Sequence, residues 1–255
     1  MSRIGIIGVG HLAQDLVAGW MRNPEERPEI VLSPRNASKA AGLARDYGLT
    51  IAASNAEVVA NTDIVILASR PAQAAGAVDG LPWRADQQLV SVCAGVTIDD
   101  LKAARPAVCH RAMPLTASRI GESPTLLYPD SPVLRHALKS LGPVIALPDE
   151  PSFDLATVNA AVYGWVFALI AEVTDYTISE GLDPAVARHI TTHSFRAATG
   201  MILKHPGQPI SDMIDDLATP GGITEQGLSH LVSEDALKAW GRASEQVVQR
   251  LLRRT

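Results

Sequence analysis

One short stretch near the start of the chain limits the possible folds more than any other. Residues 3–7 form a mainly β-branched apolar run, as expected of a buried parallel strand, and residues 8–13 then read G-V-G-H-L-A. A helical pattern follows at once, with one apolar face made of Leu12, Leu16, Val17 and Trp20. In this context Gly8 permits a tight turn, Gly10 lets a pyrophosphate approach the backbone, and Ala13 allows close helix–strand packing. The stretch predicts a dinucleotide-binding turn; the alternative is a purely structural turn.

The helix that begins at this turn supplies free N–H groups and partial positive charge for phosphates. We therefore expect Gly8, Gly10, His11 and Leu12 to lie against the pyrophosphate of the cofactor. For His11 simple packing is the alternative.

The residues after the second predicted strand, 29–32, indicate which dinucleotide binds. NAD-binding proteins place an acidic residue here, which bonds the ribose 2′-hydroxyl. This chain has no acid at that point but has a hydroxyl, a guanidinium and an amide, which can donate to a 2′-phosphate. We predict NADP(H), bound through Ser33, Arg35 and Asn36; the alternative is an ordinary polar loop.

The first 150 residues alternate strand and helix patterns. Strands are expected at 3–7, 29–32, 49–52, 63–68, 89–94, 107–113, 126–128 and 144–147. Such alternation predicts an α/β, Rossmann-like doubly wound sheet. Ligands of these sheets bind at the carboxyl ends of the strands. Five more residues at such ends are therefore expected to bind the cofactor: Ala68, Arg70, Pro71, Ala94 and Gly95.

Strand patterns stop near residue 150, and the rest of the chain reads as helices at 153–180, 183–204, 211–217 and 225–255. We expect an NADP-binding domain over 1–150 and an all-helical domain over 151–255. The helix at 153–180 is apolar on almost every side, so it has to be buried all round. We predict that it packs against the same helix of a second subunit, which makes this the dimerisation domain; whether dimers assemble further is left open.

Composition excludes several other classes. The 255 residues carry a net charge of −5 and only 4% aromatic side chains, which argues against a nucleic-acid partner. Cys93 and Cys109 each lie in an apolar run, which indicates reduced, buried thiols. No signal segment is evident, and the longest charge-free apolar stretch, residues 155–171, is short for a membrane helix. We expect a soluble cytoplasmic protein with no membrane partner.

Three further motifs identify a family. Residues 91–98 read S-V-C-A-G-V-T-I, similar to the family pattern S-x-A-A-G-V-T-I; residues 111–114 read R-A-M-P, similar to R-x-M-P. The most specific motif, T-P-G-G-I-T at 219–224, is similar to S-P-G-G-T-T. On these motifs the chain resembles the pyrroline-5-carboxylate reductase family from end to end. The resemblance implies a homodimeric NADPH-dependent oxidoreductase of proline biosynthesis that reduces 1-pyrroline-5-carboxylate.

The chain departs from the family pattern in three places. Residues 115–117 read L-T-A where the family has N-T-P, and Arg70-Pro71 stands for lysine–proline, which keeps the charge. Residues 159–165 read N-A-A-V-Y-G-W in place of the glycine-rich S-G-S-G-P-A-Y. The glycines that leave room for the substrate are replaced by larger side chains, so a different imine or a carbonyl-derived substrate stays open.

The second glycine motif suggests how a carboxylated imine would bind. Two glycines leading into a helix expose several N–H groups to an anion. We expect the substrate carboxylate on Gly221, Gly222, Ile223 and Thr224, with Met113 and Tyr163 nearby. Thr224 is the predicted catalytic hydrogen-bond donor. The alternatives are a proline–glycine turn with a capping threonine, and a core position for Tyr163. Because an iminium is already protonated, hydride transfer to it needs orientation more than a strong acid.

Other functions are weighed against this one. An NADP-binding regulatory protein that has lost the reaction stays open. A 3-hydroxyacid dehydrogenase would use a lysine on the interdomain helix, and residues 153–180 contain none. His189 and His193 are spaced i, i+4, but no glutamate stands between them as in zinc proteases, and we expect no metal.

Overall fold

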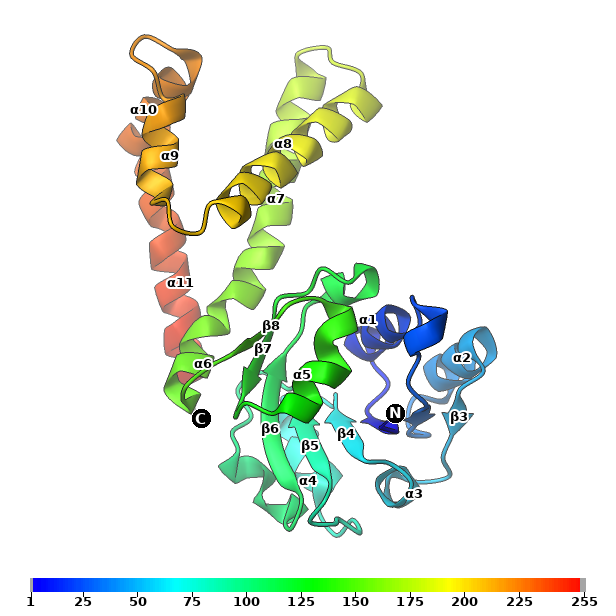
Figure 1. Ribbon diagram of the computed structural model, residues 1–255. Helices are drawn as coiled ribbons and strands as arrows, with labels where there is room; N and C mark the ends of the chain where they lie inside the picture. Colours follow the sequence, from blue (N-terminus) through cyan, green and yellow to red (C-terminus); the bar gives the residue numbers. More distant parts are fainter. Residues whose placement is uncertain (1, 253–255) are drawn as a thin grey trace. The chain divides into compact units, whose positions relative to one another are not determined.

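A computed structural model describes residues 2–252 (Figure 1). The chain divides into two units: one reaches Thr157 and takes in the end of the last helix, and the other is Val158–Gln249. The first unit holds the sheet, and the second is built of helices joined by loops.

The described strands form one sheet in the order β3-β2-β1-β4-β5-β6-β7-β8. Their bounds are β1 Ile4–Ile7, β2 Ile30–Leu32, β3 Thr50–Ile51, β4 Ile64–Leu67, β5 Gln88–Ser91, β6 Val108–Met113, β7 Thr125–Tyr128 and β8 Val144–Ala146. Neighbouring strands are parallel except for β6 and β7. The Rossmann-like, doubly wound fold predicted from the alternation of strands and helices is confirmed.

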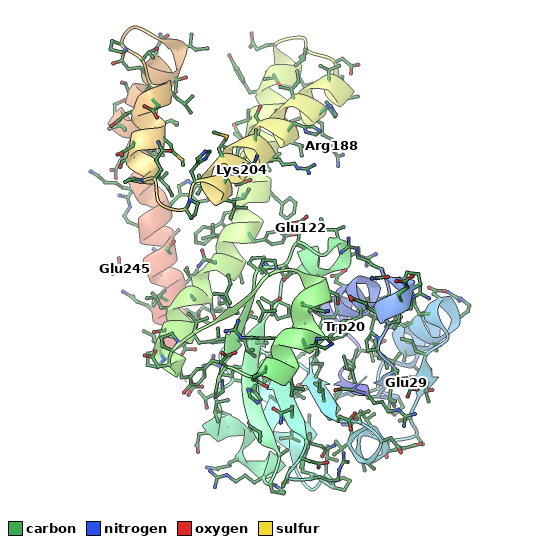
Figure 2. The ribbon with its side chains drawn as sticks, viewed as in Figure 1. Trp20, Glu29, Glu122, Arg188, Lys204 and Glu245 are labelled. Atoms are coloured by element: carbon green, nitrogen blue, oxygen red, sulfur yellow. The ribbon has the colours of Figure 1, made fainter. Side chains whose placement is uncertain are left out.

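Helices cover both faces of the sheet (Figure 1). They are α1 His11–Trp20, α2 Ala37–Tyr47, α3 Asn55–Ala60, α4 Ala74–Val78, α5 Pro132–Leu138 and α6 Glu150–Ala156, with 3₁₀ turns η1 Pro24–Glu26, η2 Pro71–Gln73, η3 Asp99–Ala104, η4 Thr116–Ile120 and η5 Lys139–Leu141. Successive side chains of a strand point to opposite faces, so Ile64 and Ile66 join one apolar cluster and Val65 and Leu67 the other. In the first cluster lies Trp20, whose Nε1 donates to the carbonyl of Ala137 at 2.8 Å (Figure 2).

Local structure in this unit differs in part from the sequence prediction. Gly48 ends α2 at φ +69°, the left-handed conformation in which a glycine commonly ends a helix. The strand expected at 89–94 ends at Ser91, and the 3₁₀ segment η3 begins at Asp99, two residues after Thr97. The Asp100 carboxylate accepts hydrogen bonds from the N–H and the hydroxyl of Thr97, both at 2.7 Å, so this turn closes on a side chain before a longer helix can start. Residues 132–141 form α5 followed directly by η5.

The second unit contains α7 Val158–Ser179, α8 Pro184–Lys204, α9 Ile210–Leu217, α10 Ile223–Ser233 and most of α11 Ala236–Leu252. Two predicted helices are interrupted. The pattern at 153–180 is α6 and α7, separated at Thr157, and the pattern at 225–255 is α10 and α11. At the second break Asp235 adopts φ +56°, a left-handed conformation that ends a helix without glycine or proline. Residues 253–255 lie outside the described residues.

The apolar side chains of helix α7 are not buried by the rest of the single chain, although its composition predicts burial on all sides. None of its side chains is buried in the single chain, and Phe167 and Tyr176 expose 59% and 64% of their surface. Burial against the same helix of a second copy stays a prediction.

The segment Glu150–Ser179, formed by α6 and α7, passes a test for membrane-spanning helices on length and composition alone. It is the only described helix that does so. The charge-free stretch 155–171 lies within this 30-residue segment. Core helices of soluble proteins pass this test too.

A buried cation fixes α6 to the sheet. The guanidinium of Arg111, near the end of β6, donates to Asp154 at 2.6 Å and to Glu150 at 2.8 Å. It lies 4.5 Å from the centre of the Phe153 ring and exposes only 2% of its side chain. Glu150 also accepts from the N–H of Ile98 at 3.0 Å. A buried charge is tolerated only when it is paired in this way.

Replacing this cation should destabilise the fold strongly. Arg111→Met removes the cation that pairs with the Asp154 and Glu150 carboxylates, and we expect the free energy of unfolding to fall by about 3–5 kcal/mol. The control is Arg135→Met, which removes an exposed pair with Asp130 and should change that free energy far less. Urea unfolding followed by circular dichroism compares the two variants, and equal losses would contradict a structural role for Arg111.

Candidate active site

The carboxyl ends of four parallel strands meet at one edge of the sheet. The N–H of Ser33 donates to Ile6 at 2.9 Å, that of Ala68 to Ile7 at 2.8 Å, and that of Val92 to Leu67 at 3.0 Å. The loops that follow β1, β2, β4 and β5 therefore start side by side. These loops, with the first residues of α1 and η2 that follow them, carry all the predicted cofactor residues, and the structure brings them to this one edge.

The glycine turn between β1 and α1 fits the predicted role. Gly8 adopts φ +96°, and a Cβ there would lie 2.7 Å from the backbone of Ala68, so no larger residue fits. At Gly10 a Cβ would meet nothing within 4 Å, which leaves the backbone open to a ligand. Helix α1 starts at His11 with no side-chain cap and no acidic residue in its first turn. Its first N–H groups are thus available to an anion.

The loop after β2 holds the glycine turn in place. Ser33 is fully buried, and its Oγ accepts a hydrogen bond from the N–H of Gly8 at 3.1 Å. The Asn36 amide donates to the carbonyl of Val9 at 2.9 Å. Arg35 is exposed, and no hydrogen bond or ion pair ties it to another residue in the described range. Of the three side chains predicted to face a 2′-phosphate, two are engaged with the turn and one is free.

The loops after β4 and β5 are linked by a thiol. Cys93 Sγ donates to the carbonyl of Ser69 at 3.1 Å, and burial raises the pKa of this thiol, which keeps it protonated. The neighbouring predicted cofactor residues are Ala68, Arg70 and Pro71 after β4, and Ala94 and Gly95 after β5.

The end of β6 carries Met113, one of the residues predicted to lie near the substrate. Arg111 of β6 lies opposite Ser91 of β5, so Met113, two residues further on, ends its strand at the same edge. Met113 exposes 8% of its surface. Leu115, which stands where the family pattern has asparagine, donates its N–H to Ser123 Oγ at 2.8 Å and adds an apolar side chain.

The second glycine turn lies in the helical unit. Gly221 adopts φ +76°, and Gly222 is the N-cap of α10 without a side-chain hydrogen bond. A Cβ on Gly222 would lie 2.9 Å from the backbone carbonyl oxygen of Thr219, so a larger residue would force the backbone of this turn to shift. Helix α10 begins at Ile223, which places Thr224 in its first turn. Thr224 is therefore part of the helix, whereas the sequence predicted a turn there.

The remaining sequence candidates lie on α7 and α8. The Tyr163 ring makes an edge contact with Phe167, with centroids 5.0 Å apart. His189 and His193 stack with centroids 4.4 Å apart. Nowhere in residues 2–252 do three or more His, Cys, Asp or Glu side chains gather as metal ligands.

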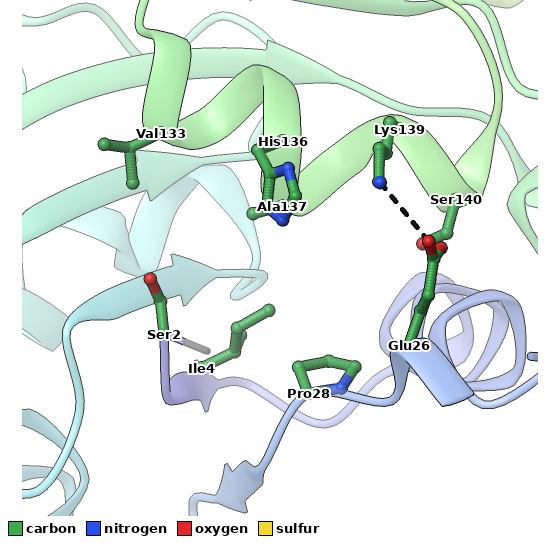
Figure 3. A pocket seen from close by; sticks show the side chains of 9 residues that line it. All are labelled: Ser2, Ile4, Glu26, Pro28, Val133, His136, Ala137, Lys139 and Ser140. Atoms are coloured by element: carbon green, nitrogen blue, oxygen red, sulfur yellow. Dashed lines mark hydrogen bonds and ion pairs between the residues drawn. The ribbon is translucent and has the colours of Figure 1, made fainter. Parts of the chain in front are cut away.

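A separate hollow of about 190 Å³ lies at the other end of β1 (Figure 3). Its walls include Ser2, Ile4 and His136, and the Lys139–Glu26 ion pair of 3.4 Å crosses it. It is smaller than usual ligand pockets and lies at the end of the strand opposite the glycine turn, so it is not the cofactor site.

Sequence reasoning missed one residue of the second glycine turn. Glu225 Oε2 accepts a hydrogen bond from the N–H of Gly221 at 2.7 Å. The signal was present, because a glutamate three residues after the N-cap often reaches back across the start of its helix.

Comparisons with known proteins agree with both halves of the chain. Residues 3–95 match the family described as "NADP oxidoreductase coenzyme F420-dependent", and residues 150–253 match "Pyrroline-5-carboxylate reductase dimerisation". The chain is 28% identical to pyrroline-5-carboxylate reductase 2 of Bacillus subtilis, covering 91% of this chain and 87% of that protein. It is 27% identical to pyrroline-5-carboxylate reductase of Pseudomonas aeruginosa, covering 98% of each.

Solved structures show the same fold. The 1-pyrroline-5-carboxylate reductase of Streptococcus pyogenes superposes with a TM-score of 0.86 at 24% identity, covering 98% of each chain. A reductive aminase of Aspergillus terreus in complex with NADPH superposes with a TM-score of 0.62 at 19% identity, covering 98% of this chain and 91% of that one. The fold, the dimerisation-domain match and the curated relatives agree with the three sequence motifs and together support a member of the pyrroline-5-carboxylate reductase family.

Proposed function

We propose that the protein reduces a cyclic imine with NADPH, the substrate being 1-pyrroline-5-carboxylate or a close analogue. One observation carries the cofactor assignment: the start of α1 next to Gly8 and Gly10. This helix has no side-chain cap and no acidic residue in its first turn, and the space beside Gly10 is empty, so an anion can reach the backbone N–H groups. Relatives named pyrroline-5-carboxylate reductase, aligned over almost the whole chain, support the reaction. Their names also support a place in proline biosynthesis, and a cytoplasmic location is part of this proposal.

The first unit would hold the cofactor. Gly8, Gly10, His11 and Leu12 lie where the pyrophosphate would bind. Arg35 would bind the 2′-phosphate as an exposed planar cation, while Ser33 and Asn36 keep the turn in place. NADPH supplies the hydride when bound. The strand ends at Ala68, Arg70, Pro71, Ala94, Gly95 and Met113 would orient the nicotinamide and its partner.

The second unit would contribute donors to the substrate. The N–H groups of Ile223 and Thr224 open the α10 helix, and the Thr224 hydroxyl can donate to the imine nitrogen. Tyr163 is a weaker candidate, because its ring already packs on Phe167. We also propose that the unit pairs with a second copy through α7 and its neighbours, which would cover apolar side chains such as Phe167 and Tyr176.

The affinities for NADPH and NADH test whether Arg35 binds the 2′-phosphate. Arg35→Ala should weaken NADPH binding tenfold or more and leave NADH binding nearly unchanged, because a hydrogen bond to a charged group contributes about 1.5–3 kcal/mol. Arg45→Ala, near the other end of α2, removes an exposed Arg–Asp pair and should change neither affinity. Isothermal titration with both nucleotides measures the effect, and equal loss for NADPH and NADH would refute the assignment.

The reaction is tested by NADPH oxidation with 1-pyrroline-5-carboxylate, piperideine carboxylates and open-chain keto acids. We expect turnover of a cyclic imine, and Thr224→Val should lower kcat/KM by about tenfold or more through the lost hydrogen bond, with NADPH affinity unchanged. Ser229→Ala, further along α10, is the control. Tight NADPH binding without turnover of any imine would favour a regulatory NADP-binding protein instead.

A further inference from the structure

The loop after β5 is open at the place where the cofactor is expected to bind. Gly95 adopts φ +76°, and a Cβ there would meet nothing within 4 Å. Ala94 beside it is exposed. On one side of this open part the buried Cys93 thiol donates to the carbonyl of Ser69, in the loop after β4, at 3.1 Å. A loop held on one side only would keep conformational freedom that a ligand has to remove on binding.

Glu150, the first residue of α6, holds the loop on its other side. The Oε1 atom of this carboxylate accepts hydrogen bonds from the N–H of Ile98 at 3.0 Å and from Arg111 at 2.8 Å. Arg111 exposes only 2% of its side chain and also donates to Asp154 at 2.6 Å. A carboxylate oxygen has lone pairs for both donors. The buried cation therefore fixes the carboxylate, and the carboxylate fixes the end of the loop.

The order of the strands indicates which part of a dinucleotide this loop would meet. Strand β1 lies between β2 and β4, and β5 follows β4. With the pyrophosphate at the turn after β1, one half of the cofactor extends toward β2 and the other half toward β4 and β5. The adenosine half carries the 2′-phosphate, for which Arg35 after β2 is the proposed partner. The nicotinamide half would therefore extend toward the loop at Gly95.

We propose that Glu150 is a positioning residue for the nicotinamide half of NADPH. It acts through the loop: by fixing Ile98 it keeps Ala94 and Gly95 in the conformation that the cofactor binds. When this hydrogen bond is lost, the loop has to be ordered during binding, and the affinity falls. The inference rests on the NADPH site proposed above at the turn after β1.

The test measures the two halves of the cofactor separately. Isothermal titration gives the Kd for NADPH and for adenosine 2′,5′-bisphosphate, which contains the phosphorylated adenosine without the nicotinamide. Glu150→Ala should raise the Kd for NADPH about fivefold or more through the lost hydrogen bond and leave the Kd for the bisphosphate unchanged. The control Asp154→Asn alters a partner of the same buried cation but keeps the bond to Ile98. It should lower the urea midpoint of unfolding and leave both Kd values unchanged.

Two conservative variants separate the length of the side chain from its charge, and they serve as the test if Glu150→Ala does not fold. Glu150→Gln keeps an oxygen within reach of the Ile98 N–H and should bind NADPH as the wild type does. Glu150→Asp keeps the charge beside Arg111 but is one methylene shorter, so it should weaken NADPH binding as Glu150→Ala does.

Three results would overturn the inference while the NADPH site stands. The first is an equal loss of affinity for NADPH and for the bisphosphate in Glu150→Ala. The second is an NADPH affinity that neither Glu150→Ala nor Glu150→Asp changes, and the third is an equal loss of NADPH affinity in Asp154→Asn. Failure of the wild-type protein to bind NADPH would instead overturn the proposed function itself.

Discussion

The end of β1 packs so closely on the end of β4 that only glycine fits at position 8. A single Cβ there would collide with the backbone of Ala68, and the positive φ of Gly8 opposes any side chain as well. This approach sets the path of the glycine turn and the start of α1. The strand ends on either side follow from parallel pairing, which brings the loops after β2, β4 and β5 to the same place. The cofactor edge is thus a consequence of backbone packing before any side chain contributes.

Polar residues next to this edge show how far sequence reasoning reaches. The strands were predictable because buried parallel strands are continuous apolar runs, and Gly48 marked the end of α2 by its left-handed conformation. The roles of Ser33 and Asn36 could not be predicted, because a serine or asparagine after a strand can form hydrogen bonds with a ligand or with a neighbouring loop equally well. Which of the two occurs depends on the positions of Gly8 and Val9, which lie 25 and 27 residues away in the chain.

The helical half was predictable in content but less so in its breaks. Asp235 interrupts the last helix in a conformation that the sequence does not announce, since no glycine or proline stands there. The all-round apolar pattern of α7 indicated burial, yet the single chain leaves the helix uncovered. A chain's hydrophobic pattern records every surface that becomes buried, including those covered by another molecule. The two glycine turns also differ in a way that motif matching hides: α1 begins without an acid, and α10 begins with Glu225.

The hydrogen bonds from the β2 loop to the glycine turn limit how cofactor preference can be redesigned. To change the preference from NADPH to NADH, an acidic residue is usually placed after the second strand. In this chain Ser33 and Asn36 stand after that strand and would be candidates for the replacement. Both side chains, however, also hold the backbone on which the pyrophosphate is proposed to rest. An acid at either position would remove a support of the turn and weaken both nucleotides together. A selective exchange has to start at Arg35, whose side chain serves no other part of the fold.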